Sequence, residues 1–159
     1  MNTININDYI LTDETNACKG TIWLHKLPND TSLFDIISKL HKKYKNETFV
    51  ITQIINIENK IIDREVNFSN CIFQEEVNFS NCDFAESIYF NETILKKKVF
   101  FKSCKFNFTA SFTNTCFESL AEFQYSTFCY NANFQHAKFI SKEEVLINFY
   151  YCPVKIKKA

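Results

Sequence analysis

Phenylalanine recurs along the middle of this chain with a fixed period. From residue 68 to residue 139, large apolar side chains alternate at intervals of five and six residues, giving an 11-residue repeat through seven consecutive units. A weaker unit with isoleucine in these places precedes them at residues 55–65. The chain has 18 phenylalanines but one glycine and two prolines, so a regular repeating structure must account for the excess. The predicted core residues are Phe68, Phe73, Phe79, Phe84, Phe90, Leu95, Phe101, Phe106, Phe112, Phe117, Phe123, Phe128, Phe134 and Phe139.

The spacing within each unit favours strands over helices. The first, third, sixth and eighth positions are apolar or small, and the others are mostly polar. Alternation with period two is typical of a short strand that buries one face, and the polar residues between strands supply turns. On a helix, the same four positions would spread around nearly the whole circumference, and Asn, Ser, Thr and Phe disfavour helix interiors. Because one unit cannot bury its own pair of large side chains, the units must stack into an all-β solenoid.

Several units resemble the pentapeptide-repeat family, whose repeat is a small residue, Asn or Asp, Leu or Phe, a polar residue and any residue. The matching segments are VNFSN at 66–70, VNFSN at 77–81, CDFAE at 82–86 and ANFQH at 132–136. The resemblance implies a right-handed quadrilateral β-helix with the small residue and the Phe pointing inward. The departure is one extra residue in every second repeat, which we expect to form a bulge at a corner. These extra residues are Glu76, Ser87, Lys98, Thr109, Leu120 and Asn131.

The size of one coil stays open at this point. A four-sided, 22-residue coil is favoured, and it would stack Cys82 over Cys104. A two-sided, 11-residue coil is the alternative, and it would stack Cys71 over Cys82.

The flanking segments do not repeat, and we divide the chain into three parts. Residues 1–54 are expected to form a small α+β cap, residues 55–142 the β-helix, and residues 143–159 a C-terminal cap or dimerisation segment with a basic tail. The pattern Ser-x-x-Asp at residues 32–35 resembles a capping box and predicts a helix over 32–45. Short strands are expected at 21–24 and 48–54.

Composition excludes several classes of function. Lys plus Arg and Asp plus Glu both number 18, so we expect neither nucleic acid nor a membrane as a partner. A single glycine excludes the P-loop, the dinucleotide fingerprint and the nucleophile elbow, and no cofactor is expected. The N-terminus lacks the zones of a signal peptide, so we expect a cytoplasmic protein, and the bias toward Asn, Lys, Ile and Phe suggests an AT-rich bacterial or phage genome.

The residues that could support catalysis or bind a metal are few. Seven cysteines are an odd number without a Cys-x-x-Cys pair, so we expect reduced thiols that mostly pack in the core, and no metal site. His41 and His136 are expected to be solvated. We therefore predict a protein that is not an enzyme, with no catalytic residues. The alternative is an enzyme in the N-terminal segment that uses Cys18 and His25.

Some positions that should face outward are not polar, and they indicate either a protein-binding surface or packing under another segment. The candidate partner-binding residues are Tyr89, Phe100, Phe108, Tyr125 and Tyr130, and Ile72, Ile94, Leu120 and Ile140 share the property. Lys96, Lys97 and Lys98 form a local basic cluster, which is either a solvated corner or a patch that contacts phosphate.

The leading hypothesis is a non-enzymatic scaffold that presents the faces of a rigid β-helix to another protein, with a possible homodimer through residues 143–159. The family resemblance also implies an alternative, DNA mimicry directed at a type II topoisomerase such as gyrase. That mechanism needs a strongly negative surface, yet residues 66–141 contain seven acids and six lysines. A one-sided acidic stripe around Glu75, Glu76 and Glu86 would be required.

Overall fold

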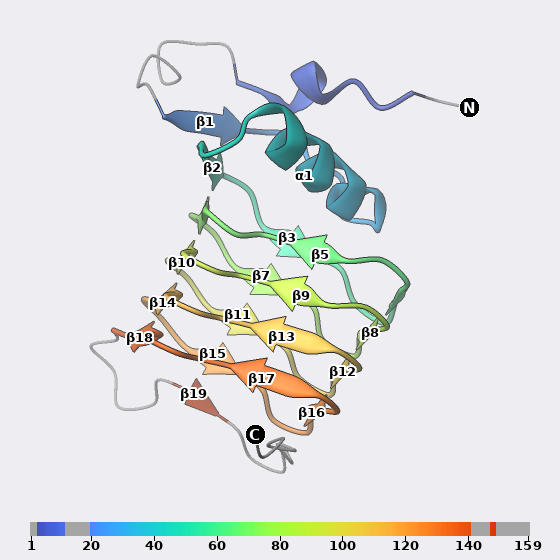
Figure 1. The fold of residues 1–159 in the computed structure, drawn as a ribbon, viewed down its shortest axis with the longest axis vertical. Helices are drawn as coiled ribbons and strands as arrows, with labels where there is room; N and C mark the ends of the chain where they lie inside the picture. Colours follow the sequence, from blue (N-terminus) through green and yellow to red (C-terminus); the bar gives the residue numbers. More distant parts are fainter. Residues whose placement is uncertain (1–2, 12–19, 141–146, 149–159) are drawn as a thin grey trace.

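The computed structural model describes residues 3–11, 20–140 and 147–148 and forms a parallel β-solenoid (Figure 1). A short 3-10 helix, η1 (Ile6–Tyr9), and one α-helix, α1 (Ser32–Lys43), lie at its N-terminal end.

The strands form four parallel sheets, one for each side of the solenoid. Sheet A contains β1 (Thr21–Leu24), β2 (Thr48–Ile51), β6 (Cys71–Phe73), β10 (Ile94–Leu95), β14 (Cys116–Phe117) and β18 (Lys138–Phe139). Sheet B contains β3 (Ile55–Asn56), β7 (Val77–Asn78), β11 (Val99–Phe100), β15 (Ala121–Glu122) and β19 (Ile147–Asn148). Sheet C contains β4 (Ile61–Ile62), β8 (Asp83–Phe84), β12 (Lys105–Phe106) and β16 (Thr127–Phe128). Sheet D contains β5 (Val66–Asn67), β9 (Ile88–Tyr89), β13 (Thr109–Ser111) and β17 (Asn131–Asn133).

Each coil has four sides, and the chain visits sheets D, A, B and C in turn. In Figure 1 sheet D faces the viewer, sheet A lies on the left and sheet C on the right, so the coils descend with a right-handed sense. The register shows the coil length directly, because Val77 pairs with Val99 and Val99 pairs with Ala121. This is the register of a 22-residue coil. The four-sided coil is confirmed, and the two-sided alternative is wrong.

The corners between sheets D and A and between sheets B and C are tight turns with one residue at positive φ. In the turn from Phe112 to Thr115, the Thr115 N–H donates to the Phe112 carbonyl at 3.2 Å and Asn114 has φ 56°, as a type II turn requires. The same position recurs once in every repeat unit, at Asn59, Asn70, Asn81, Glu92, Ser103, Asn114, Tyr125 and His136. Asparagine tolerates this conformation best among residues with a side chain, which explains its frequency in the repeat.

A second asparagine position also belongs to these corners. The Asn67 Oδ1 accepts a hydrogen bond from the Ser69 N–H at 2.9 Å, and the Asn78 Oδ1 does the same for the Ser80 N–H at 3.0 Å. This local bond satisfies a backbone donor as the chain leaves the strand. The Asn that follows the small residue in the repeat is thus explained by turn formation.

Replacing Glu92 by Asn should stabilise the protein. Glu92 is exposed and has φ 55°, a conformation that costs a residue with a longer side chain more than it costs Asn. We expect Glu92→Asn to raise the free energy of unfolding by about 0.5–1 kcal/mol in urea denaturation. Glu86→Asn is the control, because Glu86 is also exposed but lies in a corner without positive φ. An equal gain in both variants would contradict this explanation.

Four of the extra residues lie at the other two corners, as expected, and Thr109 and Asn131 are the first residues of β13 and β17, but none of the six is a bulge. Glu76 directly precedes β7, and its carbonyl accepts a hydrogen bond from the Ile55 N–H at 3.0 Å. The carbonyls of Ser87, Lys98 and Leu120 are paired in the same way with the preceding coil. The sixth residue therefore widens the corner while its carbonyl stays in the ladder, whereas a bulge would leave it unpaired.

The interior is filled by columns of phenylalanine rings that continue from coil to coil. The ring centroids of Phe84 and Phe106 are 5.2 Å apart, those of Phe106 and Phe128 are 4.6 Å apart, and the rings of each pair are nearly parallel. Of the predicted core residues, Phe68 through Phe128 are fully buried. Phe134 and Phe139 are half-buried, because they belong to the last described coil and lack a complete coil below them among the described residues.

The small residue at the sixth position has a role that the spacing alone does not reveal. The Thr93 and Thr115 hydroxyls donate to the carbonyls of Phe68 and Phe90, both at 2.6 Å, across to the preceding coil. The Cys104 thiol donates in the same way to the Phe79 carbonyl at 3.0 Å. Cys82 and Ser126 repeat this contact with Ile57 and Phe101. Five of the seven sixth-position residues thus combine small size with a donor, which suits a buried carbonyl that would be costly to leave without a partner. The exceptions are Cys71, which donates to Ser69 in its own turn, and Ala137, which has no donor.

The N-terminal segment covers the first coil. Helix α1 lies across the upper end of the solenoid and buries Leu33, Phe34, Ile36, Ile37 and Leu40 (Figure 1). The Phe34 ring lies 6.0 Å from Phe68 and 6.1 Å from Phe79, so the helix continues the aromatic core. The helix ends two residues before the predicted position 45. Strand β2 pairs with β6 in the 22-residue register, with Phe49 opposite Cys71, so regular stacking already begins inside the segment assigned to the cap.

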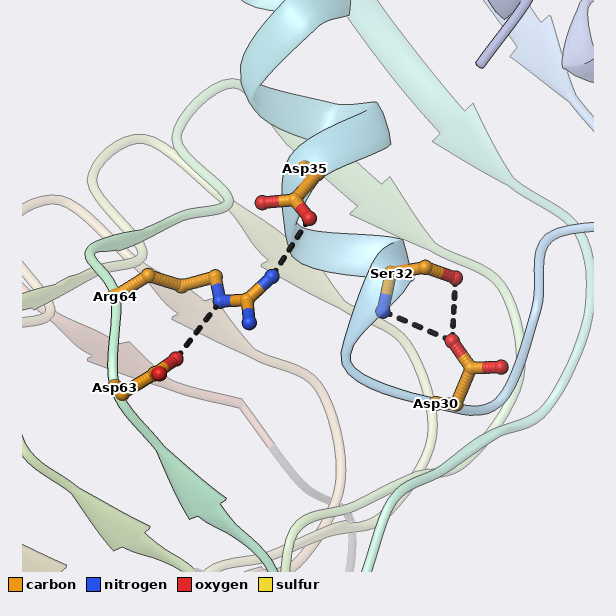
Figure 2. A network of polar contacts seen from close by, with 5 residues as sticks. All are labelled: Asp30, Ser32, Asp35, Asp63 and Arg64. Carbon is orange, nitrogen blue, oxygen red and sulfur yellow. Dashed lines mark hydrogen bonds and ion pairs between the residues drawn. The ribbon is translucent and has the colours of Figure 1, made fainter. Parts of the chain in front are cut away.

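The predicted capping box is wrong, and Figure 2 shows the contacts that replace it. Asp30 accepts hydrogen bonds from the Ser32 backbone N–H at 2.8 Å and from the Ser32 hydroxyl, and these bonds lower the pKa of Asp30. Asp35 points toward the first coil, where its carboxylate pairs with the Arg64 guanidinium at 2.6 Å. Arg64 also contacts Asp63 at 3.1 Å. The acid that should close the box instead links α1 to the solenoid.

At the C-terminal end the register changes. A regular coil would pair Ala121 with position 143, but Ala121 pairs with Ile147 in β19, four positions later in the sequence. The predicted dimerisation segment, residues 143–159, otherwise lies outside the described residues.

Candidate functional site

One outer face of the solenoid carries a continuous apolar column. On sheet A, the outward residues Val50, Ile72, Ile94 and Cys116 are in register on successive strands, and Trp23 pairs with Val50 on β1. Val50 is buried, and the others are half-buried. Neighbouring strands lie about 4.8 Å apart, so these five side chains span about 20 Å along the solenoid axis. We call this column face A.

The corresponding outward columns on the other three sheets are mostly polar. Sheet D presents Asn67, Tyr89, Ser111 and Asn133, sheet C presents Ile61, Asp83, Lys105 and Thr127, and sheet B presents Asn56, Asn78, Phe100 and Glu122. Face A is therefore the described face on which apolar outward residues follow one another from Trp23 to Cys116, and the exposed Lys138 on β18 ends the column.

The structure disperses the predicted aromatic binding residues. Tyr89 lies on sheet D and Phe100 on sheet B, both half-buried. Tyr125 lies at the corner between sheets B and C and is 53% exposed. Phe108 and Tyr130 occupy the same place in successive coils, at the corner between sheets C and D, and are 49% and 44% exposed. These five residues cannot contact one flat partner together.

The lysine cluster lies at a corner where opposite charges surround it. Lys96, Lys97 and Lys98 connect β10 to β11 and are exposed. One coil earlier the same corner holds Glu75 and Glu76, and one coil later it holds Glu118. This arrangement favours a solvated, locally neutral corner over a phosphate-contacting patch.

The acidic residues that DNA mimicry would need do not form one stripe. Glu75 and Glu76 lie at the corner between sheets A and B, whereas Glu86 lies at the diagonally opposite corner between sheets C and D. Sequence could not reveal this separation, because it depends on the number of sides in one coil.

The five cysteine thiols in the part of the chain that the structure describes are of two kinds. Cys71, Cys82 and Cys104 are buried, and burial raises the pKa of each thiol. Cys116 and Cys129 are half-buried, and partial burial raises the pKa of Cys116 as well. The raised pKa favours the protonated, unreactive form of Cys71, Cys82, Cys104 and Cys116. Within the described residues, no group of three or more His, Cys, Asp or Glu side chains could hold a metal ion.

The prediction of a solvated His41 is wrong. Its ring lies edge-on against Phe49, with centroids 5.0 Å apart, and its Nε2 is buried without a hydrogen-bond partner among the described residues. Burial lowers the pKa of His41, partly opposed by the Asn67 backbone. His41 follows Ile37 by four residues, which places it at the edge of the buried face of α1, where it is half-buried. His136 is exposed in its turn, and His25 is half-buried, while its proposed partner Cys18 lies outside the described residues.

Scans of this chain against protein-family models, against curated proteins and against solved structures found no match. Among the described helices, none has the length and apolar character that crossing a bilayer requires. Sequence reasoning found Ile72 and Ile94 but missed Val50 and Trp23, because both lie in the assigned cap. The signal that could have placed Val50 in the column is the inward pair Phe49 and Ile51 on either side of it, because this pair matches Cys71 and Phe73 one coil later.

Proposed function

We propose that this chain is a non-catalytic module of the pentapeptide-repeat type that binds another protein in the cytoplasm through face A. The observation that carries the proposal is the column of Ile72, Ile94 and Cys116 on an outer face, which continues from the buried Val50. Each residue is held in place by strand pairing, so little conformational entropy is lost when a partner covers it. Aligned apolar side chains on a rigid support suit the centre of a protein interface.

The surroundings of the column also fit this role. Glu92 lies at the corner before β10, Lys96 lies directly after β10, and Glu118 follows β14. Interfaces commonly combine an apolar centre with a polar rim, where charges of both signs select the partner and its orientation. Face A thus has both parts within three coils.

DNA mimicry is the weaker proposal. It is less well supported because the acids at 75, 76 and 86 lie at opposite corners and because Lys96, Lys97 and Lys98 interrupt the acidic column of their corner. A mimic would still bind its topoisomerase in a salt-sensitive manner, which the following experiment detects.

The test changes face A without touching the interior. In the double variant Ile72→Lys/Ile94→Lys, two charges enter the apolar column, and Asn78→Lys/Thr127→Lys adds the same charge to sheets B and C as a matched control. Tagged protein captures its partner from host lysate, and the purified partner is then titrated against all three proteins. We expect the wild type and the control to bind in high salt and the face A variant to lose at least tenfold in affinity.

Two results would contradict the proposal. Equal affinity of the wild type and the face A variant would exclude face A, provided that both variants retain the wild-type circular dichroism and melting temperature. Recovery of a topoisomerase subunit that dissociates in high salt would favour DNA mimicry instead.

A further inference from the structure

The two edges of face A carry opposite charges at the same height. Strand β10 contributes Ile94 to the apolar column, with Glu92 two residues before it and Lys96 two residues after it. Both charged side chains are exposed, and neither forms an ion pair with another described residue. Face A therefore has an acid on one edge and a base on the other, at equal distances from its apolar centre line.

The neighbouring strands have edges that also match each other. The residues two positions before and after the column residue are Asn70 and Gln74 beside β6, and Asn114 and Glu118 beside β14. An amide can donate to a second amide or to a carboxylate, so either pair of side chains forms a favourable contact. From β6 to β14, no strand has like charges on both edges.

One symmetry operation brings these matched edges together. When two copies of face A meet about a two-fold axis parallel to the solenoid axis, every residue keeps its height, and the two edges exchange sides. Glu92 of each copy then lies opposite Lys96 of the other copy, which gives two ion pairs. In the centre, Ile72 and Ile94 each meet the same residue of the second copy. The apolar column of one copy thus covers the apolar column of the other, inside a polar rim.

We propose that the partner of face A is a second copy of this chain, bound face to face about this two-fold axis. The inference rests on the proposed function of face A and names its occupant. Face A extends about 20 Å along the solenoid and about 13 Å from Glu92 to Lys96, at about 3.3 Å per residue. This area is smaller than that of a standard protein interface, so the dimer is weak, with a Kd of about 10–100 μM.

Lys138 distinguishes this arrangement from the opposite one. It is exposed on β18, one strand beyond Cys116, and the proposed axis brings it near Lys138 of the second copy. Two solenoids that run in opposite directions, with Ile72 opposite Ile94, would instead place Lys138 opposite Trp23, where a cation and an aromatic ring attract each other. Lys138→Ala should therefore strengthen the proposed dimer about threefold, whereas it would weaken the opposite arrangement.

The test is sedimentation equilibrium of the purified full chain at concentrations from about 1 μM to about 1 mM. Glu92→Lys and Lys96→Glu each put like charges into both ion pairs, so each variant alone should dimerise at least tenfold more weakly than the wild type. An equimolar mixture of the two variants restores opposite charges in both pairs and should dimerise like the wild type. Glu86→Lys and Lys105→Glu are the matched controls, because both residues are exposed and lie away from face A, at the corner between sheets C and D and on sheet C.

Weak single variants, with a mixture and controls that behave like the wild type, would support the proposal. It is overturned if the wild type is monomeric at about 1 mM, if the mixture stays as weak as the single variants, or if Lys138→Ala weakens the dimer. A dimer that persists in Ile72→Lys/Ile94→Lys would also overturn it. The lysate capture above has a separate outcome: a monomeric wild type that captures a different protein through face A would exclude the dimer and keep the proposed function.

Discussion

Phe101→Ala should lower the free energy of unfolding by about 3–5 kcal/mol, because it removes a fully buried ring from the centre of the aromatic core. The Phe101 ring lies 5.1 Å from Phe123, 5.6 Å from Phe90 and 5.7 Å from Phe79, measured between centroids. It therefore contacts the coils on both sides, and the strand pairing around it leaves little freedom to fill the cavity. Urea denaturation followed by circular dichroism measures the change.

Phe100→Ala is the control for this substitution. Phe100 is the adjacent residue and the same amino acid, but it points outward on sheet B and is only half-buried. We expect its loss to cost about 1 kcal/mol or less. If the two variants were equally destabilised, it would be wrong that the third residue of each repeat unit points inward and the second points outward.

Thr115→Val should lower the free energy of unfolding by about 1–3 kcal/mol, although threonine and valine have nearly the same shape. Thr115 is completely buried, and its hydroxyl donates to the Phe90 carbonyl of the preceding coil at 2.6 Å. Valine preserves the packing but removes the donor, so the carbonyl loses this hydrogen bond in a site that water does not reach. The free energy of unfolding in urea is again the measured quantity.

The matched control is Thr113→Val, two residues earlier. Thr113 lies in the corner turn after β13 and is half-buried, and its hydroxyl contacts the Ser111 hydroxyl at 3.1 Å, a bond that water can replace. We expect Thr113→Val to change the free energy of unfolding by less than about 0.5 kcal/mol. A stable Thr115→Val protein would show that the sixth position selects size alone and that its hydrogen bond contributes little.

The fold could be predicted from the sequence because the same spacing of apolar residues recurs in every repeat unit. Each repeat unit has the same alternation of inward and outward residues. A deviation in one unit, such as Leu95 where the other units have Phe, therefore does not hide the pattern. The helix of the cap was also predictable, since Leu33, Ile36, Ile37 and Leu40 have helical spacing.

The surface could not be predicted to the same degree, because it depends on which residues share a side of the coil. In the four-sided coil, Ile72 and Ile94 are neighbours, whereas Tyr89 and Phe100 lie on different sheets. The pairing of Asp35 with Arg64, far apart in the chain, likewise requires the position of α1 on the first coil. Local sequence contains neither piece of information.

The most direct test of the four-sided stack uses the native Cys116. Ile94 is its register partner on the adjacent strand of sheet A, at a spacing that suits a disulfide. The variant Ile94→Cys should therefore form an intramolecular disulfide between position 94 and Cys116 on mild oxidation, identified by mass spectrometry of the digested protein. The variant Lys105→Cys places a thiol one repeat unit before Cys116 but on sheet C, and it should form no such link. A disulfide between position 105 and Cys116, with none between position 94 and Cys116, would contradict the 22-residue coil and the faces derived from it.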